Sequence, residues 1–364
     1  MRRPRLALDP TDALALLGAA SHVNLAWVGP DGRPGLRALH VAVLPGPPPT
    51  VVFHGSEVGE KQALLGRRVV LQAEEVLATI PSTFTDPERA CPATTYYQSV
   101  QAEGVAEEVV APEAKAAALE ALMGRFQPQG GHVPIEAHHP LYAKAVAGVQ
   151  VVAVPLTQVS GKANLGQAKP IEVRRAIIEG LWRRGLPRDP EVIERLRAAT
   201  DRDPAPPTFF APSGVTLHAW APPSDADVVA AHLADAYWNS SFSQDDLRRA
   251  HLASAAWVVG RDAEGLCATA RAISDDTKHA WIYDVWVHPR ARGRGVATAL
   301  MALLLDHPRL RGAAKIHLGT RDAQPLYRKL GFEEREVARF THMERAGALR
   351  PDPSLRALKT VSEP

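Results

Sequence analysis

The feature that most constrains this chain is an apolar strand that runs directly into a glycine-rich turn and then into an apolar helix. The strand covers residues 281–287, the turn holds Gly293 and Gly295, and the helix begins at 295. Glycine lets the backbone turn tightly and lets a ligand approach it closely. The N–H groups at the start of the helix would point outward, so the pattern predicts a cradle for an anion such as a pyrophosphate.

Two common glycine-rich phosphate motifs do not fit this turn. A Walker loop ends in Gly-Lys-Ser/Thr, which does not follow here, and the turn lacks the Gly-x-Gly-x-x-Gly spacing of a dinucleotide site. Strand and helix patterns alternate on both sides of the turn, which predicts a self-contained α/β domain over 207–348 and a loose tail over 349–364. The expected strands are 214–219, 255–260, 266–273, 280–287 and 314–320, and the expected helices are 224–237, 243–252, 295–306 and 323–330.

Two motifs in this domain resemble those of the GNAT-type N-acetyltransferases. The first is Arg292-x-x-Gly295-x-Ala297 after the strand, and the second is Leu-Tyr-x-x-Leu-Gly-Phe at 326–332. They follow one another in the order that the family has, and the resemblance covers residues 214–340. It implies that acetyl-CoA is the co-substrate and that a small amine accepts the acetyl group.

The resemblance also implies roles for individual residues. Val285 and Val287 would flank the pantetheine arm, and Tyr327 would stand near the sulfur and protonate the leaving thiolate. A phenol suits this role because its pKa, about 10, lies close to that of a thiol. The alternative is that Tyr327 is an aromatic core residue. The backbone amides expected to hold the pyrophosphate are those of Arg292, Gly293, Arg294, Gly295, Val296 and Ala297.

Asp284 is the second candidate catalytic residue of this domain. It lies inside an otherwise apolar strand, between Ile282 and Trp286 on one face. A carboxylate there is costly to bury without a partner. It would receive the substrate ammonium, act through water as a base, or serve as a hydrogen-bonded structural residue. The residues expected to line an acceptor pocket are Trp238, Ser241, Arg271 and Asp275.

The N-terminal part of the chain consists of closely spaced strand patterns and predicts a β-barrel-like domain over 1–170. The expected strands are 22–28, 36–44, 51–54, 68–73, 97–110 and 146–154, and the expected helices are 9–19 and 112–126.

Residues 171–206 differ in character and predict a helical appendage followed by a linker, because the run at 203–207 is rich in proline. One face of the first helix carries Arg174, Arg175, Arg183 and Arg184. We expect this face to be solvated, and the alternative is an anion-binding helix.

Several N-terminal segments resemble the FMN-binding split barrels of the pyridoxamine 5'-phosphate oxidase type, nitroimidazole-reductase-like members included. The matching segments are 31–34, 52–61, 97–100 with Gly104, and Ser-Gly-Lys-Ala-Asn-Leu-Gly-Gln at 160–167, together with Arg37 and Cys91. The whole chain resembles bifunctional proteins that fuse such a barrel to a GNAT domain. The expected fold class is therefore α+β with two domains, a split β-barrel followed by a GNAT α/β fold.

This second resemblance implies a flavin phosphate held at a dimer interface, and hence a homodimer through the barrel. Arg37, Ser56 and Lys61 are the expected phosphate contacts, since two cations and a hydroxyl make a suitable anion site. Tyr97 and Ser99 would contact the flavin from the partner subunit.

His54 is expected near the cofactor, and its alternative is a strand histidine with a satisfied hydrogen bond. Glu60 departs from the pattern, because true oxidases carry an arginine at that place. FMN is the expected cofactor, while haem, a deazaflavin or an empty barrel stay open. The barrel would perform a redox step, act as a sensor, or serve only to dimerise the transferase.

Composition and residue spacing bear on binding to nucleic acid, membranes and metals. The 42 basic and 40 acidic residues give a net charge of +2, which offers no reason to expect binding to nucleic acid or to a membrane. Cys91 and Cys267 fit no disulfide or metal spacing, and we expect a cytoplasmic protein. No metal site is expected either, because the spacing of the N-terminal histidines fits no ligand set: His22, His40, His132, His138 and His139.

Overall fold

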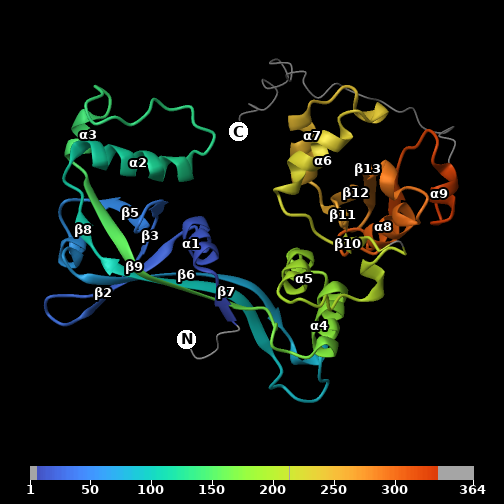
Figure 1. Ribbon diagram of the computed structural model, residues 1–364, viewed down its shortest axis with the longest axis horizontal. Helices are drawn as coiled ribbons and strands as arrows, with labels where there is room; N and C mark the ends of the chain where they lie inside the picture. The colour runs from blue at the N-terminus through green and yellow to red at the C-terminus, as the bar shows by residue number, and fades with distance from the viewer. Residues whose placement is uncertain (1–5, 213, 335–364) are drawn as a thin grey trace, which may run out of the picture. The chain divides into compact units, whose positions relative to one another are not determined.

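The computed structural model describes residues 6–212 and 214–334 (Figure 1). The chain divides into two compact units, Met1–Gly319 and Thr320–Pro364. The first unit holds two separate sheets. The expected tail at 349–364 and the last part of the expected transferase domain, 335–348, lie outside the described residues.

Antiparallel strands form the first sheet. Its strands are β1 (Ala7–Leu8), β2 (Val23–Val28), β3 (Pro34–Leu39), β4 (Ala42–Leu44), β5 (Thr50–Gly55), β6 (Arg68–Ile80), β7 (Thr94–Val105), β8 (Glu107–Glu108) and β9 (Gln150–Asn164), and beside them lie α1 (Pro10–Ala19), α2 (Pro112–Phe126), α3 (Ala143–Ala147), η2 (Glu60–Leu64) and η3 (Ser82–Phe84). The main strand order is β3-β2-β6-β7-β9-β5-β4, with β1 and β8 also paired to β9. The predicted barrel-like domain is thus confirmed as an antiparallel half-barrel.

Local chemistry explains why α1 begins where it does and how it closes the barrel. The Asp9 carboxylate accepts a hydrogen bond from the Thr11 amide at 2.8 Å, and Pro10 occupies the first helical position. Ala13 and Leu17 are fully buried on the inner face of the helix. They join the core that the sheet supplies through residues such as Leu25 and Phe53.

Four predicted strands differ from what the structure shows. The run 97–110 is divided between β7 and β8, and the run 146–154 overlaps the end of α3 and becomes β9, which extends to Asn164. The run 36–44 is not one strand, because β3 pairs with β2 while β4 pairs with β5, and the chain must break between them. The strand predicted at 68–73 continues as β6 to Ile80, paired with β7 along its whole length. Hydrogen bonds to β7 hold this second half in place, although Glu74 and Glu75 interrupt its apolar pattern.

Two helices, α4 (Ile171–Arg184) and α5 (Asp189–Ala198), follow the barrel. The expectation that the arginine face of α4 is solvated is wrong for Arg174, which is only 3% exposed. The cause is α5, which packs against α4 and provides the carbonyl of Leu196 as an acceptor for the Arg174 guanidinium, while Thr200 accepts a second hydrogen bond.

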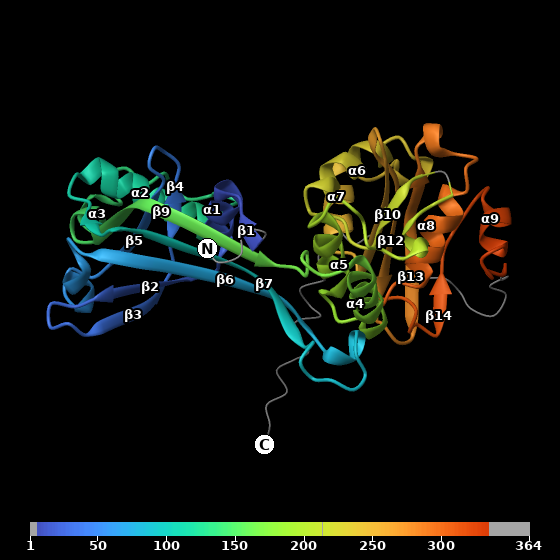
Figure 2. The same ribbon diagram turned by 60° about the horizontal axis from the view of Figure 1, so that its bottom comes forward.

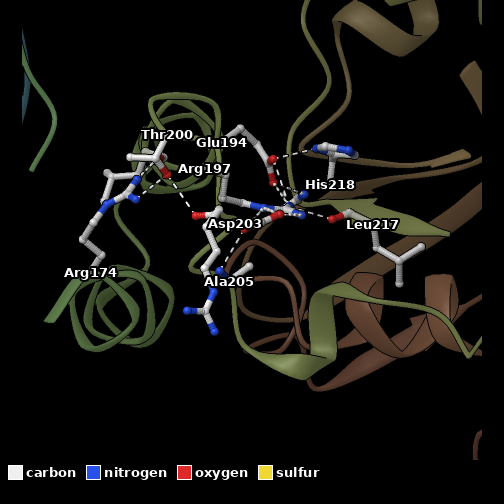
Figure 3. A network of polar contacts seen from close by, with 11 residues as sticks. Arg174, Glu194, Arg197, Thr200, Asp203, Ala205, Leu217 and His218 are labelled. Carbon is white, nitrogen blue, oxygen red and sulfur yellow. Dashed lines mark hydrogen bonds and ion pairs between the residues drawn. The ribbon is translucent and has the colours of Figure 1, made fainter. Parts of the chain in front are cut away.

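A buried polar network joins α5 to the first strand of the second sheet (Figure 3). Arg197, only 5% exposed, pairs with Glu194 at 3.0 Å and with Asp203 at 2.9 Å, and it donates to the Leu217 carbonyl at 2.6 Å. Glu194 in turn accepts from His218 at 2.7 Å and from the Ala219 amide at 2.8 Å. The proline-rich run that follows α5 is therefore fixed through Asp203.

The second sheet belongs to the C-terminal α/β domain. Its strands are β10 (Thr216–His218), β11 (Ala256–Asp262), β12 (Gly265–Ser274), β13 (His279–Val287) and β14 (Lys315–His317), in that order, and its helical elements are η4 (Pro207–Phe209), α6 (Asp225–Leu233), η5 (Tyr237–Asn239), α7 (Gln244–Leu252), η6 (Pro289–Ala291) and α8 (Val296–Leu305), with α9 (Gln324–Arg328) in the second unit. Figure 2 shows α6 and α7 on one side of the sheet and α8 on the other. Among the strands in the described part of this domain, the β13–β14 pair alone is parallel, and β14 ends at His317 whereas β13 continues to Val287.

Candidate functional site

The glycine-rich turn after β13 is held in a defined shape. Arg292 reaches back along the chain, and its Nε donates to the Val287 carbonyl at 2.9 Å. Gly293 and Gly295 have φ angles of 71° and 76°, in the left-handed region that side chains with a Cβ rarely adopt. Gly295 is also the N-cap of α8, so the turn delivers the chain directly into the helix.

The start of α8 is the predicted anion cradle. The first intrahelical hydrogen bond runs from the Ala299 amide to the Gly295 carbonyl at 3.1 Å. The amides that precede Ala299 at a helix start have no acceptor within the helix, and the helix dipole makes this end positive. The structure therefore places Gly295, Val296 and Ala297 where an anion would meet backbone N–H groups.

Asp284 has an unusual backbone conformation that redirects its side chain. Its φ angle is 52°, and the register between β12 and β13 shifts at this point, as in a β-bulge. The carboxylate accepts from Arg271 Nε at 2.6 Å, from Trp238 Nε1 at 3.0 Å and from Asn239 Nδ2 at 3.3 Å. Asp284 is buried, and these three donors satisfy much of its hydrogen-bonding capacity.

Of the predicted pocket residues, the structure brings Trp238 and Arg271 to Asp284. Ser241 is exposed on the loop between α6 and α7. Asp275 instead closes the turn between β12 and β13, where its carboxylate accepts from the amides of Thr277, Lys278 and His279. These backbone hydrogen bonds, that from His279 foremost, lower the pKa of Asp275 to about 2.

Two residues near Asp284 were not predicted from the sequence, Asn239 and His251. The His251 ring is buried; its Nδ1 lies 2.7 Å from the Leu247 carbonyl, and its Nε2 has no hydrogen-bond partner in the described structure. Burial lowers the pKa of His251, the Asp284 charge opposes this, and the Arg271 charge adds to it. The signal for His251 was its position four residues after Leu247, on the apolar face of the predicted helix.

Tyr327 lies on α9, in the second unit. It is 8% exposed, and its ring meets that of Phe332 edge-on at a centroid distance of 6.0 Å. The role of Tyr327 as an acid stays a prediction, as do those of Val285 and Val287, which lie on the last part of β13.

In the barrel, three of the predicted cofactor residues lie in one place. His54 is the exposed residue that follows the buried part of β5, Ser56 begins the following loop, and Lys61 returns from η2 to donate to the His54 carbonyl at 3.2 Å. Burial lowers the pKa of His54, and the Lys61 charge lowers it further. Arg37 comes from β3, at the other end of the strand order, where it donates to the Leu36 carbonyl.

Tyr97 and Ser99 lie together on β7, both half-buried. Ser99 pairs with Lys162 of β9 in the sheet register, and the Lys162 ammonium lies 5.3 Å from the centre of the Tyr97 ring. Lys162 belongs to the conspicuous segment 160–167, but the sequence alone did not single it out.

A cavity of about 420 Å³ lies at α5, beside the Arg197 network. Its lining is formed by Glu194, Arg195, Arg197, Ala198, Asp203, His218, Trp220, Pro222 and Arg261. The charged members of this set are paired, either with one another or, for Arg195 and Arg261, with Glu75, Glu191 and Asp225. Their mutual pairing makes this cavity a less apt ligand site than the helix start at α8.

Over residues 6–212 and 214–334, no group of three or more His, Cys, Asp or Glu is arranged to hold a metal ion. His132 and His138 lie 3.2 Å and 3.1 Å from Glu120 and Glu113, respectively. Within the same described ranges, no helix is both long and apolar enough to cross a bilayer.

Family profiles match both parts of the chain. That of the pyridoxamine 5'-phosphate oxidase family matches residues 9–163, and that of the GNAT acetyltransferase family matches residues 222–332. The comparison with curated proteins finds no match.

Solved structures similar to this chain cover one domain each. A candidate GNAT acetyltransferase of Xanthomonas campestris pv. campestris is 32% identical, with 36% of this chain and 92% of that chain covered and a TM-score of 0.33. A candidate 5-nitroimidazole antibiotic resistance protein of Bacteroides thetaiotaomicron is 17% identical, with 43% and 86% covered and a TM-score of 0.35. An FAD and haem binding protein of Mycobacterium smegmatis is 21% identical, with 41% and 68% covered and a TM-score of 0.35.

The glycine turn and the helix start at α8 agree with the profile match to the GNAT family. The chain belongs to the GNAT family through its C-terminal domain, which follows an N-terminal domain of the pyridoxamine 5'-phosphate oxidase type.

Proposed function

We propose that the C-terminal domain transfers an acetyl group from acetyl-CoA to the nitrogen of a small amine. The observation that carries this proposal is the left-handed turn at Gly293 and Gly295, which ends at the start of α8, where the first amides have no acceptor within the helix. The CoA pyrophosphate is an anion of the kind that such a helix start binds. The amides of Arg292 to Ala297 hold it, and Val285 and Val287 flank the pantetheine arm.

In the transfer itself, the neutral amine nitrogen attacks the thioester carbonyl, the C–N bond forms and the C–S bond breaks. The leaving thiolate takes a proton from the Tyr327 phenol. The nitrogen releases one proton to water as it becomes an amide, and the Tyr327 phenolate regains a proton from water. Asp284 fixes Arg271 and the α6–α7 loop in place through its three hydrogen bonds. Its occupied carboxylate supports a positioning role better than that of a base.

Substitution of Gly295 tests the cradle. Gly295→Glu introduces a negative charge at the pyrophosphate position and abolishes acetyl-CoA binding, measured by titration calorimetry on the full chain. Gly295→Ala carries the same left-handed strain, about 1–2 kcal/mol, without the charge and keeps measurable binding. Gly265→Glu is a second control, because Gly265 also has a left-handed φ but lies in the β11–β12 turn. Binding retained in Gly295→Glu would exclude the pyrophosphate assignment.

We further propose that the barrel binds a flavin phosphate at His54, Ser56 and Lys61, with Arg37 as an additional cation. The support is the arrangement of a lysine ammonium and a serine hydroxyl around the end of β5, a donor set that suits a phosphate. A bound flavin supplies redox chemistry, and haem is the alternative cofactor. Tyr97, Ser99 and Lys162 would line the flavin from the partner subunit.

The proposed partner of the barrel is a second copy of the chain. Apolar side chains exposed on β2 and β3, Val28 and Leu36, support burial against another surface. The proposed location is the cytoplasm, which the free thiols of Cys91 and Cys267 favour.

A further inference from the structure

We propose that an aromatic surface on β12 and β13 binds the acceptor, and that the acceptor is a primary amine that carries an aromatic ring. This inference rests on the proposed acetyl transfer and names its substrate class. The aromatic surface consists of Trp238, Ile273, Trp281 and Tyr283, with Arg271 and His317 at its borders.

The strand register places these side chains on one face of the sheet. Arg271 is paired with Tyr283, and Ile273 is paired with Trp281 across β12 and β13. Residues two apart on a strand point to the same side, so Tyr283 and Trp281 are neighbours. The surface extends to β14, where the His317 ring stacks on the Trp281 ring with 4.6 Å between the ring centroids.

Their exposure is unusual for residues of this kind. Trp238, Tyr283, Trp281 and Ile273 are 40%, 40%, 42% and 44% exposed. The alternate side chains of the same strands, such as Ala272 and Ile282, are buried. A contiguous apolar surface left open is typical of a binding site.

Asp284 connects this surface to the transfer chemistry. The bulge at Asp284 turns its carboxylate toward Arg271, and the Arg271 guanidinium lies 5.0 Å from the centre of the Tyr283 ring. The same carboxylate holds Trp238, which brings the α6–α7 loop to the surface. The next residue along β13 is Val285, where the pantetheine stretch begins, so an amine on the aromatic surface lies beside the end of the CoA arm.

The chemistry of the surface selects the acceptor class. Flat rings of tryptophan and tyrosine favour stacking or edge contacts with another ring. Asp284 is already bonded to Arg271, Trp238 and Asn239, which leaves this carboxylate poorly suited to the second ammonium of a diamine. The acceptor therefore needs an aromatic ring and a single amine nitrogen. An arylalkylamine has both, because its ring rests on the aromatic surface and its nitrogen reaches the thioester.

The test compares three amines on the full chain with acetyl-CoA, with thiol release as the measurement. We expect kcat/KM for 2-phenylethylamine to exceed that for 2-cyclohexylethylamine and for cadaverine by about tenfold or more. Trp281→Ala and Tyr283→Ala raise KM for 2-phenylethylamine about tenfold and leave the Kd of acetyl-CoA unchanged. Trp281→Phe retains most of the preference.

Phe126→Ala is the matched control, because Phe126 is an exposed aromatic residue of the barrel helix α2. Equal rates for the ring-bearing amine and the saturated amine, with acetyl-CoA still bound, would overturn the inference and leave the proposed transfer intact. A loss of acetyl-CoA binding in the unmodified chain would instead overturn the proposed function. Trp281→Ala could instead dissociate a dimer and leave KM for 2-phenylethylamine unchanged. That result would also overturn the inference, because it would show that a second copy of the chain covers the aromatic surface.

Discussion

The carboxylate of Asp284 shows how one backbone angle changes the chemistry of a strand. In a regular strand, Asp284 would point away from the face that Tyr283 occupies. Its left-handed φ of 52° turns the side chain to Arg271 and Trp238. Aspartate adopts this region more readily than most residues, which explains why an acid occupies the position.

Tyr327 carries the first prediction at the residue scale. Tyr327→Phe removes the phenol but keeps the ring and its contact with Phe332, so the acid is lost while the fold is retained. We expect kcat to fall about 10²-fold, with the Kd of acetyl-CoA unchanged in calorimetry. Tyr142→Phe serves as the control, since its hydroxyl bonds the Val133 carbonyl in the barrel. An unaltered kcat in Tyr327→Phe would remove the phenol from the mechanism.

His307 predicts how stability depends on pH. Its ring is buried against Trp182, and this burial lowers its pKa to about 4, despite a hydrogen bond with the backbone of Ala219. The unfolded chain protonates a histidine near pH 6.5, so the unfolded state binds more protons between pH 6.5 and 4. The stabilisation is therefore complete above pH 6.5 and is lost as the pH falls toward 4.

The measurement is the free energy of unfolding in urea at pH 7 and at pH 5. We expect the loss on acidification to be greater in the unmodified chain than in His307→Phe by roughly 2 kcal/mol. Phenylalanine keeps the aromatic shape but cannot titrate, and the other histidines contribute equally to both proteins. The same loss in both proteins would show that His307 does not titrate in this range.

At the residue scale, the sequence motifs located the turn at Gly293 and Gly295, because glycine has few other reasons to occur twice before an apolar helix. They could not reveal the partners of Asp284. Trp238 and Asn239 lie 46 and 45 positions away along the chain, and a bulge decides that they meet. His251 was hidden for the same reason, since a lone histidine on a helix does not disclose what its free nitrogen faces.

At the scale of elements, α5 is expected to depend on Arg197. Replacement by methionine leaves Glu194 and Asp203 without their buried cation, and we expect a loss of about 3–5 kcal/mol in the free energy of unfolding. Arg195→Met is the control, because Arg195 on the same helix is more exposed and pairs with Glu75 and Glu191. Its removal should cost at most about 1 kcal/mol in urea unfolding. Equal losses in the two variants would contradict the role of the buried network.

The periodicity of apolar residues predicted most helices and strands. The features that it missed are set by partners that are distant in the sequence. The extension of β6 to Ile80 is one case, since Glu75 interrupts the pattern but pairs with Arg188 and Arg195 from the helices after the barrel. The burial of Arg174 is another, because the acceptors come from Leu196 and Thr200. Local sequence carries no information on such pairs.

For the whole molecule, the expected state is a dimer that carries a flavin. The purified full chain should show a flavin absorbance spectrum that bleaches with reductant, and light scattering should give twice its mass of 39.3 kDa. Lys61→Met removes the proposed phosphate cation and should lose the flavin, whereas Lys144→Met on α3 should keep it. A Soret band would show that the cofactor is haem rather than a flavin. A featureless visible spectrum after addition of FMN would show that the barrel binds neither and serves only for dimerisation.

The network around Arg197 bears on how such a chain can evolve. Composition places the joint between the domains at the proline-rich run after Asp203, where a recombination event would be expected to exchange one domain for another. Yet α5 gives Arg197 to the Leu217 carbonyl and Glu194 to His218, while Arg188 of the same helical region is paired with Glu75 of the barrel. A transferase domain transplanted from residue 207 onward would lack the side chains that its first strand requires. A transferase domain that keeps these contacts has to include α5, and removing α5 from the barrel would in turn leave Glu75 without Arg188.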